Sequence, residues 1–253
     1  MTDLHVYPYG PAGSPHVLAI HGLTGHGQRW QTLATRHLAD VALTAPDLLG
    51  HGRSSWAAPW TIDANAAALA DLLDEPTVVV GHSFGGAIAL RLAASHPDLV
   101  SALVLRDPAV GLSGGWMRDI ADDMLASPDY TDRAEARSEK ANGSWADVDA
   151  DELDRELDEH LVDLPNGRVG WRISIPAMMS YWSELARPIT LPPNTIPTTV
   201  VRASRTEPPY VTDDLLAGLA SRPNFKLLDF DCNHMVAQAR PADTAAVILK
   251  ALG

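Results

Sequence analysis

The stretch VVVGHSFGG, residues 78–86, decides the fold of this chain. Its three valines predict a buried strand, and the small and apolar residues 87–94 after it predict a helix. Between them lies the G-x-S-x-G spacing, in which a serine occupies a sharp turn from strand to helix and the residues two positions away must be small. Such a turn lifts the hydroxyl above the sheet and places the next backbone N–H at a helix N-terminus. We therefore predict that Ser83 is a nucleophile.

Short apolar runs on both sides of this stretch alternate with helical patterns. Strands are expected at residues 17–20, 41–45, 78–80, 103–105, 198–201 and 226–228, and helices at 31–38, 62–73, 85–95, 213–220 and 241–252. Continuous apolar strands that alternate with helices are typical of a parallel sheet buried on both faces. The sequence therefore predicts an α/β fold, with a mostly parallel central sheet flanked by helices.

The alternation stops between about residues 112 and 187, where no convincing strand is visible. In residues 147–164, four leucines follow helical spacing, acidic residues fill the other faces, and an Asn-Gly pair at 166–167 predicts the helix end. We interpret residues 1–111 and 188–253 as the core and residues 112–187 as a helical cap over one edge of the sheet. The alternative is a set of ordinary crossover helices, although crossover connections are usually far shorter.

A serine hydroxyl needs a base to accept its proton near neutral pH. His234 follows the last expected strand and precedes the last helix, which is the chain position that this type of turn requires of its base. Two acids compete to orient the base. Asp107 follows the strand at 103–105, Glu207 follows the strand at 198–201, and sites in parallel sheets form at such strand ends. We favour Asp107 and keep Glu207 as the alternative.

The reaction intermediate also needs backbone donors for its negative oxygen. The N–H of Phe84 is one candidate, and the N–H of Leu23, in the loop HGLTG at residues 21–25, is the second. Glycines near this loop do not form the G-x-G-x-x-G pattern, so a dinucleotide site is disfavoured. A second polar loop, DLLGHGRS at residues 47–54, either supports the site by hydrogen bonds or forms a plain surface turn.

Composition excludes several other classes of protein. The chain has 253 residues and a net charge of −13, which disfavours a nucleic-acid partner. Its one cysteine, Cys232, excludes an internal disulfide, and the ten histidines lack metal-ligand spacing, so we expect neither a metal nor another cofactor. We see no integral membrane segment and no signal peptide. We expect a cytoplasmic protein, and leave open peripheral association with a membrane or cell wall.

Taken together, the motifs resemble the α/β-hydrolase superfamily, and within it the serine esterases and lipases of actinobacteria. The resemblance rests on HG at 21–22, DLLGHGRS at 47–54, GHSFGG at 81–86, NH at 233–234 and the order serine, acid, histidine. It implies hydrolysis of carboxylic esters through an acyl-enzyme, with the cap inserted after the sixth strand of the superfamily, here 103–105. Many members carry G-x-x-D after the seventh strand, where this chain has ASRT at 203–206, and this departure implies Asp107 as the acid.

Specificity is expected to come from the insertion, because loops and caps over a rigid sheet shape the pocket. The expected substrate-binding residues are His21, Trp171, Met178, Met179 and Trp182. The cap residues among them suit an apolar acyl pocket, although each could instead dock the cap onto the sheet. The substrate is then a small-molecule or lipid ester with a short- to medium-length acyl chain.

The net charge disfavours anionic substrates, unless Arg106 or Arg172 overrides it locally. Two alternatives stay open at this point: a carbon–carbon bond hydrolase or lyase with the same catalytic residues, and a ligand-binding protein without turnover.

Overall fold

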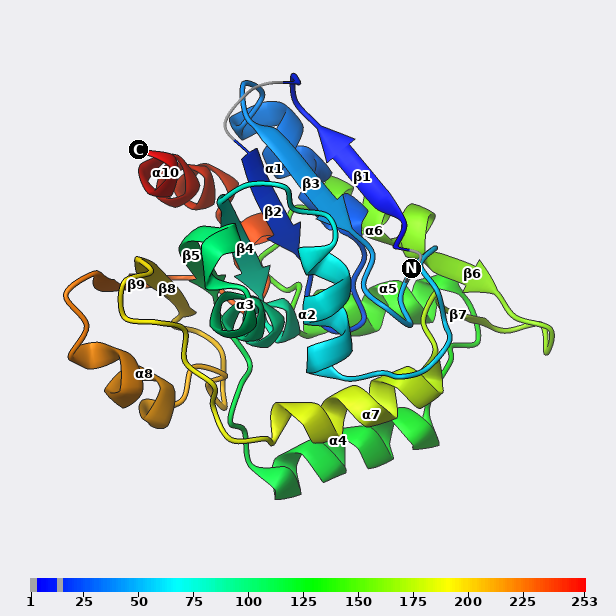
Figure 1. Cartoon of the computed structure of the whole chain (residues 1–253). Coiled ribbons are helices and arrows are strands. Elements are labelled where there is room, and N and C mark those ends of the chain that lie inside the picture. Colours follow the sequence, from blue (N-terminus) through cyan, green and yellow to red (C-terminus); the bar gives the residue numbers. More distant parts are fainter. Residues whose placement is uncertain (1–3, 13–15) are drawn as a thin grey trace.

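A seven-stranded sheet organises the chain, whose computed structural model describes residues 4–12 and 16–253 (Figure 1). The strand order is β1-β3-β2-β4-β5-β8-β9, and every neighbouring pair is parallel except β1 with β3. The strands are β1 Val6–Tyr9, β2 His16–Ile20, β3 Ala42–Pro46, β4 Thr77–His82, β5 Val100–Arg106, β8 Thr198–Ala203 and β9 Phe225–Phe230. The expected α/β fold is confirmed.

All six strands expected from the sequence are present, as β2, β3, β4, β5, β8 and β9. The sequence analysis missed β1, which is short, lies at the sheet edge and contains Pro8. Proline removes a ladder donor, and it occurs in sheets mainly on edge strands, so the usual strand signal is weak there. The strand at 103–105, after which the insertion begins, is β5.

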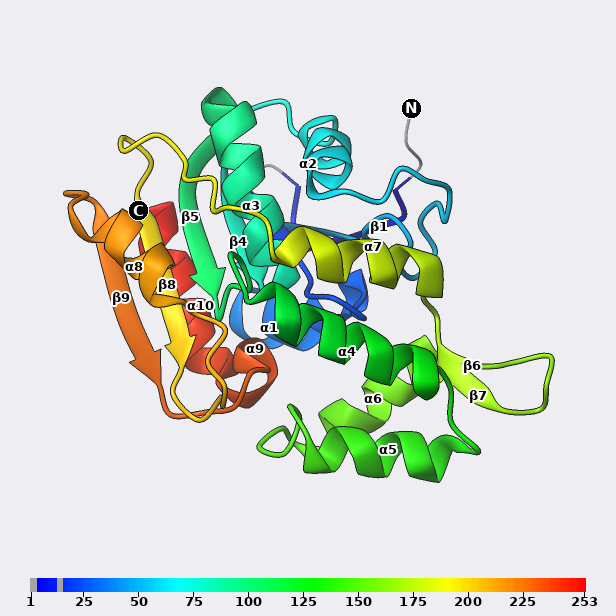
Figure 2. The same ribbon diagram turned by 90° about the horizontal axis from the view of Figure 1, so that it is seen from below.

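Helices cover both faces of the sheet (Figures 1 and 2). One face packs against α1 Gln31–His37 and α10 Pro241–Leu252, with Trp30 of the short helix η1 Gly27–Trp30. The other packs against α2 Ile62–Ala70, α3 Phe84–Ser95 and α8 Asp213–Ala220. The short helices η2 Pro97–Leu99 and α9 Val236–Ala239 complete this part. Every residue of β4 is buried, because this central strand has helices on both of its faces.

The insertion, residues 112–187, contains four helices and one hairpin. They are α4 Gly114–Ala126, α5 Arg133–Asn142, α6 Ala150–His160, the strands β6 Leu161–Asp163 and β7 Val169–Trp171, and α7 Ile175–Leu185. Helices α4 and α7 run side by side, and the hairpin projects away from the sheet in both views (Figures 1 and 2). Buried residues of α5 and α6 pack with Met235 in a small cluster of their own.

The hairpin corrects two expectations. The helix expected over 147–164 ends at His160, and the region expected to lack strands contains β6 and β7. The Asn-Gly pair is the turn of this hairpin, with Gly167 at a φ of +78°, and not a helix end. Asn-Gly between apolar residues is a strong hairpin signal because the turn needs a positive φ, which glycine adopts without strain.

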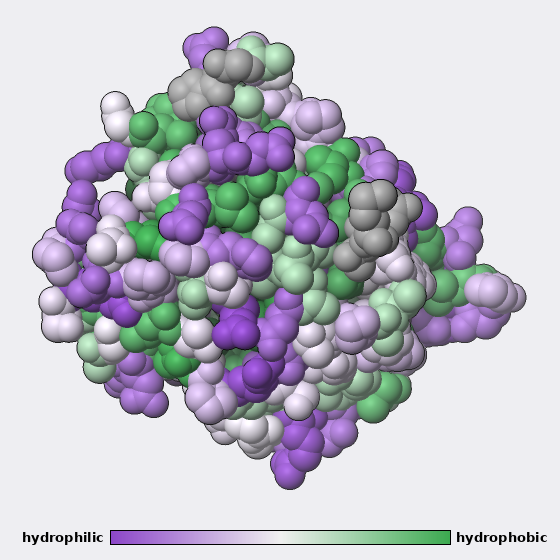
Figure 3. Space-filling model, viewed as in Figure 1, coloured by the Kyte–Doolittle hydropathy of each residue, from purple (hydrophilic) through white to green (hydrophobic). Residues whose placement is uncertain are grey.

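The surface mixes polar and apolar residues on the face shown in Figure 3. Few large hydrophobic side chains of the described residues are exposed; they are Trp56, Leu125, Leu228 and Leu249. Among the helices of the described residues, none combines the length and the apolar character that crossing a membrane requires. Residues 1–3 and 13–15 of the expected core range 1–111 lie outside the described residues.

Candidate active site

Ser83 occupies a strained turn between β4 and α3. Its φ is 53° and its ψ is −120°, a conformation that costs a residue with a side chain about 1–3 kcal/mol. Two glycines make the turn possible. A Cβ on Gly81 would lie 2.4 Å from the carbonyl oxygen of Gly85, and a Cβ on Gly85 would lie 2.5 Å from the carbonyl oxygens of Ile20 and His21. The structure therefore bears out the requirement for small residues on both sides of the serine.

Both expected oxyanion donors lie beside this turn. Phe84 is the first residue of α3, where a backbone N–H has no partner within the helix. Leu23 lines the same cavity as Ser83, and its loop passes so close that a Cβ on Gly22 would lie 3.0 Å from Cβ of Ser83. The next residue, Thr24, has a φ of 58°, so this loop turns sharply above the serine.

His234 and Asp107 form a direct pair. The distance between Nδ1 of His234 and Oδ2 of Asp107 is 2.6 Å, and Asp107 is fully buried. The backbone N–H of Ala203 donates to Oδ1 of Asp107 at 3.1 Å, so the carboxylate is held between the ends of β5 and β8. Glu207 is exposed, and among the described residues it makes no hydrogen bond or ion pair with His234. This arrangement favours Asp107 as the orienting acid.

Two further side chains enclose His234, and the sequence analysis assigned neither of them to the site. Nε2 of His82 lies 2.8 Å from the carbonyl oxygen of His234, and the ring of Tyr210 packs 4.2 Å from the imidazole, centroid to centroid. Burial lowers the pKa of His82 well below its ordinary value. His82 is therefore neutral and donates its Nε2–H to that carbonyl. Its position next to Ser83 was the signal that could have drawn attention to it.

The expected residue His21 connects two loops. The backbone N–H of Leu48 donates to Nε2 of His21 at 2.9 Å, and Nδ1 of His21 then donates to the carbonyl of Gly22 at 2.7 Å. Burial lowers the pKa of His21 well below its ordinary value, which keeps it neutral. Asp47 adds two more bonds, accepting from the N–H groups of Gly27 and Arg53 at 2.7 and 2.8 Å. The loop 47–54 thus supports the site by hydrogen bonds.

Two neighbouring cavities lie at the site, and the serine lines one of them. The first, which we call the serine cavity, has a volume of about 410 Å³ and contains Ser83, His234 and Trp182 in its wall. The second, the distal cavity, has about 500 Å³ and contains Trp171. Five residues line both cavities and mark their junction: Thr24, Ile120, Glu139, Lys140 and Ser144.

The other two expected substrate-binding residues lie in the packing of α7. Met178 is fully buried in the main core, and Met179 is partly buried against it. Neither methionine is among the residues that line the serine cavity or the distal cavity.

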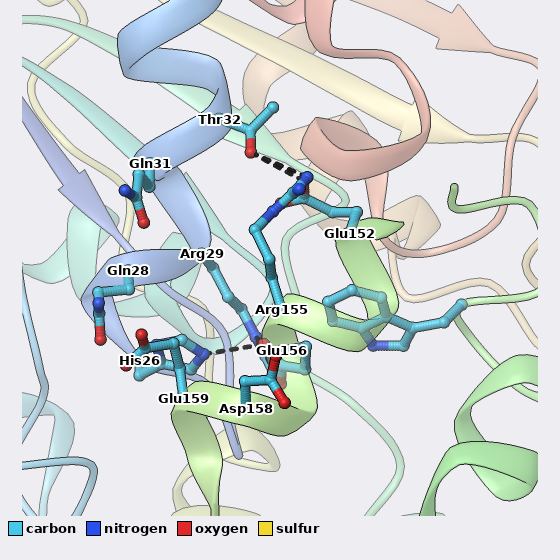
Figure 4. Close-up of a pocket in the computed structure, with 11 residues that line it drawn as sticks. His26, Gln28, Arg29, Gln31, Thr32, Glu152, Arg155, Glu156, Asp158 and Glu159 are labelled. Atoms are coloured by element: carbon cyan, nitrogen blue, oxygen red, sulfur yellow. Dashed lines mark hydrogen bonds and ion pairs between the residues drawn. The ribbon is translucent and has the colours of Figure 1, made fainter. Parts of the chain in front are cut away.

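A buried charge cluster joins the insertion to the core, and the sequence analysis missed it. The side chain of Glu156, on α6, is only 1% exposed. Its carboxylate oxygens accept hydrogen bonds from Nε of Arg29 at 3.0 and 3.1 Å and from Nζ of Lys140 at 3.0 Å. Nε2 of His26 lies 2.8 Å from Oε2 of the same carboxylate. Figure 4 shows Arg29 and His26 approaching Glu156 from the segment that leads into α1. Burial alone would raise the pKa of Glu156, but the charges of Arg29, Lys140 and His26 hold it well below its ordinary value.

Comparisons with known proteins identify the family of this chain. A family model described as the alpha/beta hydrolase family matches residues 17–247. The chain is 64% identical over 259 residues to Lipase LipV of Mycobacterium tuberculosis, an alignment that covers 100% of this chain and 99% of that protein. The resemblance noted from the motifs is confirmed.

Solved structures support the fold alone, at 22% identity. The crystal structure of E-2-(acetamidomethylene)succinate hydrolase has a TM-score of 0.83, over 98% of this chain and 94% of that one. A marine microorganism esterase has a TM-score of 0.77, over 99% of both chains.

The buried cluster leads to a stability prediction. Glu156→Gln keeps the side-chain volume but leaves the cations without their anion, and we expect a loss of about 3–5 kcal/mol in the free energy of unfolding at pH 7. Because the pKa of Glu156 is depressed in the fold, its stabilisation is complete above the ordinary value of 4.5, declines below it, and is lost as the pH falls through the depressed pKa. Urea denaturation of wild type and Glu156→Gln, from pH 7 to below pH 4.5, measures the difference in their free energies of unfolding.

The matched control is Asp154→Asn on the same helix. Asp154 pairs with Arg137 at the exposed surface, so its loss should move the urea midpoint far less. Equal midpoints for wild type and Glu156→Gln at pH 7 would contradict the prediction.

Proposed function

The chain belongs to the alpha/beta hydrolase family and is an ester-hydrolysing enzyme, and we propose that it cleaves short- to medium-chain acyl esters through an acyl-enzyme on Ser83. One observation carries the proposal. The Asp107–His234 pair, 2.6 Å between Oδ2 and Nδ1, is held at the same cavity as a serine on a strained turn. A serine, a base within its cavity and a buried acid behind that base are the groups that acyl transfer requires.

In the proposed mechanism, Nε2 of His234 takes the proton of Ser83 as Oγ attacks the ester carbonyl. The carbonyl oxygen becomes negative and accepts hydrogen bonds from the backbone N–H groups of Phe84 and Leu23. The intermediate then collapses, the C–O bond to the alcohol breaks, and His234 returns the proton to the leaving alcohol. Water attacks the acyl-enzyme by the same route and releases the carboxylic acid and free Ser83.

The proposed role of Asp107 follows from its contacts. It accepts from Nδ1–H, which leaves Nε2 free to face the serine, and its charge stabilises the imidazolium that forms during the reaction. The bond from the N–H of Ala203 fixes the carboxylate, and the bond from His82 to the carbonyl of His234 fixes the loop that carries the base. Groups fixed in this way need little rearrangement in the transition state.

We propose that the insertion acts as a cap that sets specificity. The wall of the serine cavity includes Ile120 of α4, and Trp182 and Leu185 of α7. Trp171 lies in the wall of the distal cavity, into which a longer acyl chain can extend. The apolar side chains in these walls suit the acyl chain of a small-molecule or lipid ester.

A carbon–carbon bond hydrolase with the same residues is the second candidate. It is favoured by Arg29 and Lys140, which line the serine cavity and suit a substrate with a carboxylate. Hydrolysis of simple esters distinguishes the two candidates, because we expect a carbon–carbon bond hydrolase to hydrolyse such esters poorly.

The test of the proposed function is a series of p-nitrophenyl esters from acetate to palmitate. We expect wild type to hydrolyse the short and medium chains best, and Ser83→Ala to lower kcat by about four to six orders of magnitude. The control is Ser95→Ala at the far end of the same helix, whose hydroxyl donates to the backbone carbonyls of Arg91 and Leu92 in that helix. Ester hydrolysis that survives Ser83→Ala would contradict the role of this serine.

Two variants, each of which replaces one carboxylate with an amide, distinguish the two candidate acids. Asp107→Asn should lower kcat by about 10⁴, because an amide stabilises the wrong tautomer of the imidazole. Glu207→Gln should leave kcat close to wild type, because Glu207 is exposed and makes no hydrogen bond or ion pair with His234. Steady-state kinetics on one ester measure both values, and the opposite ranking of the two variants would identify Glu207 as the acid.

A further inference from the structure

Two cations line the serine cavity, although hydrolysis of a simple acyl ester requires none. They are Arg29, from the core, and Lys140, from α5 of the insertion. The two arginines considered from the sequence, Arg106 and Arg172, are not among the residues that line this cavity. Arg106 is instead buried over the ring of Trp30, with its guanidinium carbon 4.0 Å from the ring centroid. The positive charge therefore comes from positions that the sequence did not indicate.

Lys140 occupies the junction of the serine cavity and the distal cavity. Its ammonium lies 4.2 Å from the ring centroid of Trp171 and 4.8 Å from that of Trp145, and its side chain is 11% exposed. Within residues 4–12 and 16–253, its one hydrogen bond is the donation to Glu156 at 3.0 Å. An ammonium has three N–H donors, so two remain available to a ligand in these cavities.

The charges around Lys140 do not balance within the buried cluster. Arg29 and Lys140 share the single carboxylate of Glu156, and burial lowers the pKa of His160 well below its ordinary value, which leaves that ring neutral. Glu139 also lines the cavity, but it is exposed and accepts from the hydroxyl of Tyr130, so water screens its charge. Burial lowers the pKa of Lys140 to about 8, which is the effect of a cation with too little compensating negative charge.

We propose that Lys140, supported by Arg29, binds a carboxylate on the substrate, so that the enzyme prefers acyl esters whose acyl chain ends in a carboxylate. This inference rests on the proposed ester hydrolysis at Ser83 and names its substrate class. The apolar wall between Ser83 and Lys140, which includes Leu23 and Ile120, contacts the methylene chain. The carboxylate then lies at the junction of the two cavities, where Lys140 supplies the donors that Glu156 leaves unused.

A single carboxylate fits this site better than a phosphate does. Most donors of Arg29 are already committed, because Nε and Nη2 bond to Glu156 and to the carbonyl of Thr24. Lys140 adds one positive charge and two unused N–H groups, which suit a singly charged carboxylate. A dianion would also face the exposed Glu139 and the net charge of −13.

The experiment compares two p-nitrophenyl esters that have acyl chains of equal length. One is the half ester of adipic acid, which carries a free carboxylate, and the other is the neutral hexanoate ester. We expect wild type to hydrolyse the adipate half ester with a kcat/KM at least equal to that for hexanoate. Lys140→Met, which retains an apolar side chain between the two tryptophans, should lower the adipate-to-hexanoate ratio by about ten- to a hundred-fold.

Two further variants complete the test. Lys140→Arg retains the charge and should retain most of the ratio. Arg137→Gln removes one positive charge from the same helix, in an exposed pair with Asp154, and should leave the ratio unchanged. This variant controls for the overall charge of the insertion.

The outcomes separate the two proposals. If wild type hydrolyses hexanoate but not the adipate half ester, or if Lys140→Met lowers both activities equally, the carboxylate site is wrong while ester hydrolysis stands. If wild type hydrolyses neither these esters nor the acetate-to-palmitate series, the proposed function itself fails. A fall in the ratio that Arg137→Gln reproduces would assign the preference to overall charge and would also overturn the site.

Discussion

The strained turn at Ser83 is the constraint on which the rest of the structure depends. A φ of 53° at a serine persists only where the surroundings enforce it. Here the turn packs closely against β2 and the loop after it, because a Cβ on Gly85 would lie 2.5 Å from the carbonyl oxygens of Ile20 and His21. The N–H of Ser83 also donates to the carbonyl of Arg106 at 3.0 Å, which ties the turn to β5. The turn is thus held by the strands on both sides of β4.

The ends of β5 and β8 bring the remaining groups to this turn. Asp107 follows β5 directly, its N–H donates to the carbonyl of Val201 in β8, and its carboxylate meets His234. Met235, the next residue, packs in the cluster formed by α5 and α6 of the insertion. The loop that carries the proposed base therefore contacts the insertion directly, and Glu156 anchors the same insertion to the core. In our proposal, these contacts couple the geometry of the catalytic groups to the segment that selects the substrate.

The features that could be predicted from the sequence are those that short local patterns determine. The buried strands were visible as apolar runs, and the turn at Ser83 was visible because its steric demand restricts the residues around it. The order of Ser83, Asp107 and His234 along the chain matched the sheet topology that brings two of them into contact. The hairpin β6–β7 was misjudged, although its Asn-Gly turn was visible in the sequence, because a leucine pattern of helical spacing ran into it.

The charge cluster around Glu156 could not be predicted from the sequence. Arg29 and Glu156 are 127 positions apart, and Glu156 lies on a helix whose other acidic residues are exposed or only partly buried. No local sequence pattern distinguishes Glu156 from the other acidic residues of α6. Its role follows only from the packing of α6 against η1. The same is true of Lys140, whose neighbours Trp145 and Trp171 meet it through the fold of the insertion.

The central claim is that Ser83 is the nucleophile, and covalent trapping tests it most directly. Diethyl p-nitrophenyl phosphate transfers its phosphoryl group to an activated serine and releases p-nitrophenol. Intact-protein mass spectrometry and peptide mapping should show one diethylphosphoryl group, on Ser83, formed in step with the loss of esterase activity. Loss of activity with Ser83 unmodified, or a label at another residue, would contradict the account.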